Sequence, residues 1–256
     1  DMAARQLATA QKRAELCRQR LSELRQRAAE EANTRAIEAK EQTRFAHPAL
    51  QTAAEFNTRL AQEQAEVTAS IDDRSRYAAQ ISDQLAALQK ELRESQQQIE
   101  KAGGVTDVMG IRLQAKRNKL PSLAESRRRI RGRATKTNDA QIKWIEYDNA
   151  WSELTDIGGR ADLLLAEIQP SLSPEERAAL RGELLDILQT RRTTLKALSD
   201  LYLDFSTRLA ALDIQEREFV GLVGAYADFI DAHLLWVKSR HTPATSDAGR
   251  IAEALY

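Results

Sequence analysis

The sequence predicts an all-α fold: an elongated helical bundle of long antiparallel, coiled-coil-like hairpins with no sheet. Its 256 residues include only 10 glycines, 5 prolines and 5% aromatic residues, a composition typical of long helices. Apolar residues recur at heptad spacing over long stretches of the chain. Alternating runs of β-branched residues, which would predict strands, are scarce.

The first helix is expected from Asp1 to about Phe45. Cys17 lies on an apolar heptad stripe, so we expect its side chain to be a small buried hydrophobe. The stripe fails at Glu31, and the helix should end before Pro48 because proline disfavours helix in the residue before it. The stripe consists of Leu7, Ala14, Leu21 and Ala28 together with Ala3, Ala10, Cys17 and Leu24.

A second, longer helix is expected from Ala49 to Ala102, a segment without glycine or proline. At about 1.5 Å per residue it would reach roughly 80 Å. Its seam is mostly apolar, but four polar residues on it would weaken an isolated two-stranded coil, so several partner helices should cover it. They are Asn57, Gln64, Arg74 and Ser95. The short link to the first helix predicts an antiparallel hairpin over residues 1–102.

The central helices are expected over residues 105–169. Gly103-Gly104 should end the long helix, and Thr106 or Asp107 should cap the next one. That helix is interrupted at Leu120-Pro121 and can restart at Ser122, while Gly158-Gly159 is a further weak point.

The last helix is expected over residues 174–238, and residues 239–256 read as a flexible tail or linker. Ser173, Pro174 and Glu176 form the pattern of a capping box with proline at the first helical position. We therefore expect one elongated domain over residues 1–238.

The formal net charge of zero gives no overall attraction to nucleic acid or to an acidic membrane.

Basic residues concentrate between Arg112 and Lys143. The run can pair with an acid-rich stretch between Trp144 and Thr190, face solvent, or bind phosphate groups of nucleic acid or lipid. Pairing, within the chain or with an adjacent subunit, is the interpretation we prefer because the two stretches carry opposite charge. The run also lacks the interleaved aromatic residues of single-strand binders. The candidate interaction patch is Arg127, Arg128, Arg129, Arg131 and Arg133.

The residue patterns predict no catalytic residue, no cofactor site and no metal site. The three histidines and the single cysteine do not stand at metal-ligand spacing. Adjacent carboxylates such as Asp72-Asp73 point apart on a helix, and the glycine pairs lack a phosphate-binding pattern. No run of about 18 apolar residues predicts a membrane span. A secretory signal is also absent, and the start at Asp1 suggests a processed or excised fragment.

An aromatic and aliphatic block closes the last helix. It resembles the segment that precedes the membrane helices in the large, MscK-like mechanosensitive channels of the MscS superfamily. There the pattern is Tyr-x-x-(Phe/Tyr)-(Leu/Ile)-Asp-x-x-Leu-Leu-Trp-(Ile/Val)-x-Ser. The matching residues here are Tyr226, Phe229, Ile230, Asp231, Leu234, Leu235, Trp236, Val237 and Ser239.

The resemblance implies a non-catalytic periplasmic domain of an inner-membrane channel that releases solutes under hypo-osmotic stress. It also implies a homo-oligomer, heptameric at the pore. Partners would be the transmembrane and cytoplasmic parts of the same channel and components of the cell envelope, with no small-molecule substrate. The residues from Tyr226 to Trp236 would form the junction nearest the membrane. The alternative is a soluble coiled-coil scaffold, or a nucleic-acid-associated adaptor acting through the Arg112–Lys143 run.

Overall fold

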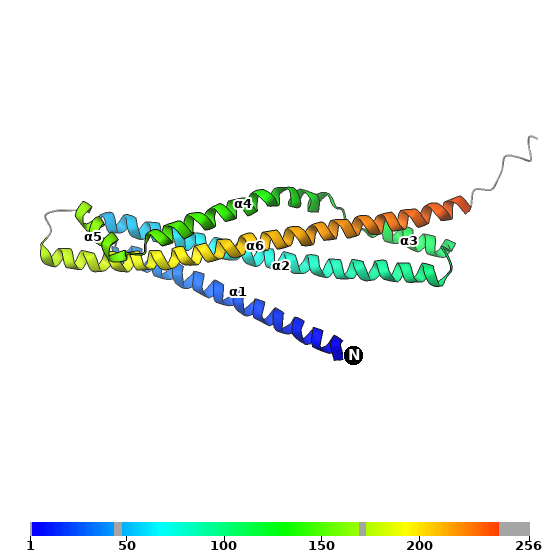
Figure 1. Ribbon diagram of the computed structural model, residues 1–256, viewed down its shortest axis with the longest axis horizontal. Helices are drawn as coiled ribbons and strands as arrows, with labels where there is room; N and C mark the ends of the chain where they lie inside the picture. Colours follow the sequence, from blue (N-terminus) through cyan, green and yellow to red (C-terminus); the bar gives the residue numbers. More distant parts are fainter. Residues whose placement is uncertain (1, 44–47, 169–172, 241–256) are drawn as a thin grey trace, which may run out of the picture. The chain divides into compact units, whose positions relative to one another are not determined.

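A computed structural model describes residues 2–43, 48–168 and 173–240, without the side chains at 3–5, 7, 8, 11, 168 and 236–240. Within these ranges the chain forms six helices and no strand, which confirms the all-α prediction (Figure 1). The helices are α1 (Met2–Gln42), α2 (Pro48–Lys101), α3 (Asp107–Lys119), α4 (Ala124–Glu153), α5 (Ile157–Ile168) and α6 (Pro174–Arg240).

The predicted end of the long helix is confirmed. Helix α2 ends in a left-handed glycine cap, in which Gly103 has φ 66° and Gly104 has φ 142°. The amide of Gly104 donates to the carbonyl of Ile99 at 3.2 Å, and that of Gly103 to Glu100 at 3.1 Å. Both bonds satisfy carbonyls that the last helical turn leaves without partners. Thr106 then caps α3 by accepting from the amide of Met109.

Replacing Gly104 with alanine should destabilise the protein by about 1–3 kcal/mol, because a Cβ is strained at this backbone angle. Gly132, within α4, is a matched control since a Cβ there meets no atom within 4 Å. Gly132→Ala should stabilise the helix by about 0.5–1 kcal/mol. Urea denaturation of both variants tests the pair, and equal effects would show that the cap contributes nothing.

The capping box at the start of α6 is also confirmed. The amide of Glu176 donates to Ser173 Oγ at 3.3 Å, and the amide of Ser173 donates to Glu176 Oε2 at 3.0 Å. The hydroxyl and amide of Ser173 lower the pKa of the Glu176 carboxyl. At α5, Asp156 accepts from the amide of Gly159 at 2.9 Å, so the predicted weak point is a capped helix start. Helix α6 then continues through Gly221 and Gly224.

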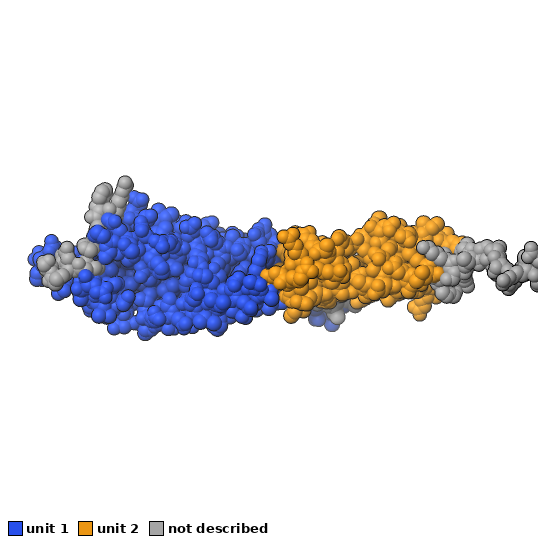
Figure 2. Space-filling model, turned by 90° about the horizontal axis from the view of Figure 1, so that it is seen from above, with its two compact units in different colours: residues 1–76, 134–211 blue, residues 77–133, 212–256 orange. Residues whose placement is uncertain are grey.

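The chain divides into two compact units, coloured in Figure 2. Unit 1 comprises residues 1–76 and 134–211, and unit 2 comprises residues 77–133 and 212–256. Each unit therefore combines parts of helices that are far apart in the sequence. The units cut across the three segments expected from the sequence, although the helix limits follow those segments closely.

The core of unit 1 is formed by α2, α4, α5 and α6. Tyr147 and Trp151 of α4 pack there, as their helical spacing suggests. The polar seam residue Asn57 also finds partners: its Nδ2 donates to the carbonyl of Ile187 at 2.8 Å and its Oδ1 accepts from Arg191 at 3.0 Å. Buried core residues include Leu50, Leu60, Leu154, Ala161, Leu184, Leu188, Leu195 and Leu198.

Among the described side chains of α1, the buried ones lie in its second half. Ala29, Ala36 and Thr43 are buried at a spacing of seven residues, and Ser22 donates to Asp72 at 2.8 Å. This face is one residue out of step with the predicted stripe through Leu21. Cys17 is consequently exposed, and the expectation that it is buried was wrong.

Candidate functional site

The C-terminal block of α6 lies in unit 2, where its first residues form core. Tyr226 and Ile230 are fully buried, and Phe229 and Leu234 pack against the same cluster. This cluster also holds apolar side chains from α2, from the link between α2 and α3, from α3 and from α6. They include Ile81, Leu85, Leu88, Val105, Leu113, Phe219 and Val223.

The buried hydroxyl of Tyr226 is paired with a seam residue of α2. Tyr226 Oη lies 3.0 Å from Ser95 Oγ. Ser95 uses its own proton on the carbonyl of Glu91 and also accepts from Lys116 Nζ at 2.9 Å. Tyr226 is therefore the donor to Ser95, because a hydroxyl has a single proton. The polar seam position at Ser95 is thus where α2 binds the tyrosine of α6.

The remainder of the block reaches the surface. Asp231 accepts from Arg117 Nε of α3 at 3.1 Å, on the exterior of unit 2. Leu235 is 66% exposed. Trp236, the last residue of the predicted junction motif, has its side chain outside the described residues. Of the six described side chains in the motif, the structure thus assigns four to the core of unit 2.

In unit 2, one buried carboxylate accepts hydrogen bonds from three side chains. Glu216 of α6 is 0% exposed and forms an ion pair with Arg133, which is 5% exposed. It also accepts from Arg129 Nε at 3.2 Å and from Tyr77 Oη at 2.6 Å. Burial, and then the hydrogen bond to Glu216, raise the pKa of Tyr77 to about 12. This Glu216 cluster binds α2, α4 and α6 together.

Two arginines of the predicted basic patch belong to the Glu216 cluster. Arg133 is buried against Glu216 and does not belong to an exposed surface, while Arg129 is partly exposed but paired with Glu216 and Glu125. Arg133 also lies 3.5 Å from Asp213. Their acidic partners are on α6 beyond the stretch that the sequence indicated. Arg127, Arg128 and Arg131 are exposed and remain the described part of the patch.

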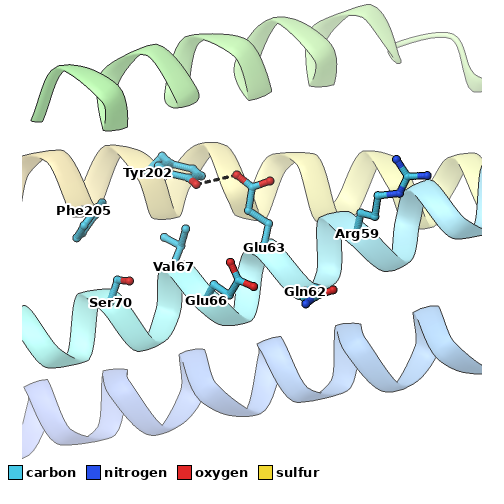
Figure 3. Close-up of a pocket in the computed structure, with 8 residues that line it drawn as sticks. All are labelled: Arg59, Gln62, Glu63, Glu66, Val67, Ser70, Tyr202 and Phe205. Atoms are coloured by element: carbon cyan, nitrogen blue, oxygen red, sulfur yellow. Dashed lines mark hydrogen bonds between the residues drawn. The ribbon is translucent and has the colours of Figure 1, made fainter. Parts of the chain in front are cut away.

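In unit 1, Figure 3 shows a pocket between α2 and α6 that is lined in part by the partly buried carboxylate of Glu63. Its lining residues are Arg59, Gln62, Glu63, Glu66, Val67, Ser70, Tyr202 and Phe205. Glu63 accepts from Tyr202 Oη at 2.7 Å and from Tyr147 Oη at 2.5 Å. Burial and Glu63 raise the pKa of both tyrosines. Glu63 therefore joins α2, α4 and α6 and is already bound by two donors.

The alkaline limit of stability should depend on Tyr77. Between pH 10 and about 12 an unfolded tyrosine ionises while Tyr77 in the fold keeps its proton, so stability falls as the pH rises through this interval. Below pH 10 both states are protonated and the contribution is fully present. Urea denaturation at pH 9 and pH 11 should show a smaller loss for Tyr77→Phe than for the original chain. Equal losses would contradict the assignment.

Comparisons with protein-family models, curated proteins and solved structures gave no match to this chain. Among the described helices, none combines the length and the apolar character that crossing a membrane requires. The described part of the chain also holds no group of three or more His, Cys, Asp or Glu residues placed to bind a metal ion. Two of the histidines considered in the sequence, His47 and His241, lie outside the described residues.

Sequence reasoning missed the buried carboxylate of Glu216 and the partly buried carboxylate of Glu63. A signal for Glu216 exists, because it stands in the apolar series of α6 that runs through Leu212, Phe219 and Tyr226. A charged residue at such a position needs a buried partner. The sequence around Glu63 contains no comparable signal, because Glu63 lies beside the seam position of Gln64 and not on the seam. Its role depends on hydrogen bonds from two tyrosines of other helices.

Proposed function

We propose that this chain is a non-catalytic, periplasmic helical domain of an MscS-type mechanosensitive channel in a bacterial inner membrane. The channel releases solutes under hypo-osmotic stress and is a homo-oligomer. The domain's partners are the transmembrane and cytoplasmic parts of the same channel and the cell envelope. The observation that carries the proposal is the Tyr226–Trp236 block, whose residues match the segment before the membrane helices of that family.

The structure of unit 2 supports a force-transmitting role for this block, since its first half is anchored and its end is exposed. Tyr226 and Ile230 fix α6 in the core, and the Arg117–Asp231 pair holds α3 against it. Helix α6 continues without interruption to Arg240. A force applied at the end of α6 would therefore be transmitted to the core of unit 2 through a continuous helix.

Membrane proximity of the end of α6 tests the proposal. In the intact protein, with Cys17→Ser, a fluorophore on Leu235→Cys should be quenched by a quencher on lipid headgroups. Glu218→Cys is the matched control, because it is exposed on the same helix and lies about 26 Å away along the axis. Stronger quenching at position 218 than at position 235 would overturn the proposed placement.

The exposure of Arg127, Arg128 and Arg131 favours a second candidate, a nucleic-acid-associated scaffold. Its signature is RNA or DNA binding that weakens steeply with salt. Changing these three arginines to glutamate should then abolish binding without unfolding unit 2, since the buried pair of Arg133 with Glu216 is left intact. No binding at low salt would exclude this candidate.

A further inference from the structure

The first half of α1 has an apolar stripe that nothing in the described chain covers. The residues are exposed at heptad spacing: Ala10, Ala14, Cys17, Leu21, Leu24 and Ala28. In proteins most helical stability comes from the packing of an apolar face and not from helix propensity, so a helix of this kind is usually stabilised by packing. We therefore expect another element to pack on this exposed face.

Charges along the stripe identify the chemistry of that partner. Arg13, Arg20 and Arg27 form one exposed flank at intervals of seven residues, and Arg18 lies on the other. Pairing α1 with a second α1 would place arginine against arginine in either orientation, which is destabilising. The stripe is rich in alanine, which allows close helix packing but buries little surface in lipid. The best occupant is a helix face whose apolar residues are flanked by acidic ones.

Helix α4 of the same unit carries such a face. Ile142 and Ile145 are exposed, at 54% and 50%, in a stripe completed by polar residues. Asp139, Glu146 and Glu153 flank that stripe and are exposed, again at intervals of seven residues. The remaining stripe positions are Thr135, Asn138, Asn149 and Ser152, which are exposed as well.

The two faces match in one parallel register. When Leu21 stands opposite Ile142, Leu24 stands opposite Ile145 and Cys17 opposite Asn138. In a parallel pair the flanking position of one helix faces the position five residues further along on its partner. The three resulting ion pairs are Arg13 with Asp139, Arg20 with Glu146, and Arg27 with Glu153. The two leucine–isoleucine layers and the three charge pairs thus agree in a single register.

The two faces do not meet within one chain. Figures 1 and 3 both show α1 and α4 on opposite sides of the α2–α6 pair in unit 1. The local pairs Arg20–Glu23 at 3.8 Å and Lys143–Glu146 at 3.2 Å are solvent-exposed, so exchanging them for intermolecular pairs costs little.

We propose that the first half of α1 docks on α4 of a second copy of this chain. This contact goes beyond the proposed function and does not require a membrane.

Reciprocal charge reversal tests the contact. One variant reverses the α1 flank and the other reverses the α4 flank. They are Arg13→Glu with Arg20→Glu and Arg27→Glu, and Asp139→Arg with Glu146→Arg and Glu153→Arg. By sedimentation velocity each variant alone should self-associate about 100-fold more weakly than the original chain. An equimolar mixture should associate again, because the reversed α1 of one variant then meets the reversed α4 of the other.

Controls separate this contact from general charge effects. Reversal of Arg127, Arg128 and Arg131 to glutamate changes the net charge as much as the α1 variant does, and it should leave association unchanged. Circular dichroism should show the same helix content in all variants. A monomeric original chain, a mixture that stays monomeric, equal loss in the control, or binding to anionic vesicles without self-association would each overturn the proposal.

Cys17 stands opposite Asn138 in the proposed register, so cross-linking between these two positions is a second test of the contact. With Asn138→Cys, a short bismaleimide should join two chains through positions 17 and 138. The matched control is Thr193→Cys, which is exposed on α6 of the same unit and outside the proposed contact. Equal cross-linking of both variants would contradict the proposed register.

Discussion

Replacing Glu216 with leucine should destabilise the protein by about 3–5 kcal/mol, one of the two largest effects of a single substitution that we expect. The change leaves Arg133, which is 5% exposed, without its buried counter-charge. It also removes the acceptor of Tyr77 Oη. Arg129 is less affected because it is partly exposed and retains Glu125 at 2.8 Å. Chemical denaturation followed by circular dichroism measures the loss.

A double-mutant cycle separates the buried charge from the packing around it. Arg133→Leu combined with Glu216→Leu should recover most of the stability lost in either single variant, since no unpaired buried charge remains. If the double variant is as unstable as the sum of the single ones, the two residues do not act as a pair. The account of the Glu216 cluster would then be wrong.

Truncating Tyr226 to alanine should have a comparable effect, about 3–5 kcal/mol, because it empties a fully buried aromatic site. Tyr226→Phe should cost only about 1 kcal/mol, since it keeps the ring and loses the hydrogen bond to Ser95. Thermal and urea unfolding of both variants provides the measurement.

Leu235→Ala is the matched control from the same C-terminal block. Its side chain is 66% exposed, so its loss should change stability by no more than about 0.5 kcal/mol. This contrast distinguishes the anchored first half of the block from its surface end. Equal destabilisation by Tyr226→Ala and Leu235→Ala would contradict that division.

Local signals explain why the helix limits could be predicted. The segment without glycine or proline from Ala49 onward specifies the interior of α2, the Gly103-Gly104 cap ends it, and Ser173 with Glu176 begins α6. Each of these signals acts on the backbone of residues close by in the sequence, so it can be recognised from the sequence alone.

Tertiary contacts explain what could not be predicted. The stripe through Cys17 is a good coiled-coil pattern, yet α1 packs on α2 through a face one residue away that begins at Ser22. Arg133 and Glu216 are 83 residues apart in the sequence, and no local pattern relates them. Ser95 looked like a defect of the seam, but it is the partner of Tyr226. Such pairings depend on which helices meet.

The central claim, that this chain is the periplasmic part of a membrane channel, is tested most directly by the location of Cys17. It is the one cysteine of the sequence and is exposed within one chain, but the proposed contact with α4 of a second copy would cover it, so the measurement uses the variant with Asp139→Arg, Glu146→Arg and Glu153→Arg. In spheroplasts that express this variant of the intact protein, a membrane-impermeant maleimide should label Cys17, and adding Cys17→Ser should abolish the labelling. Labelling of Cys17 only after lysis would place the chain on the cytoplasmic side and contradict the proposed function.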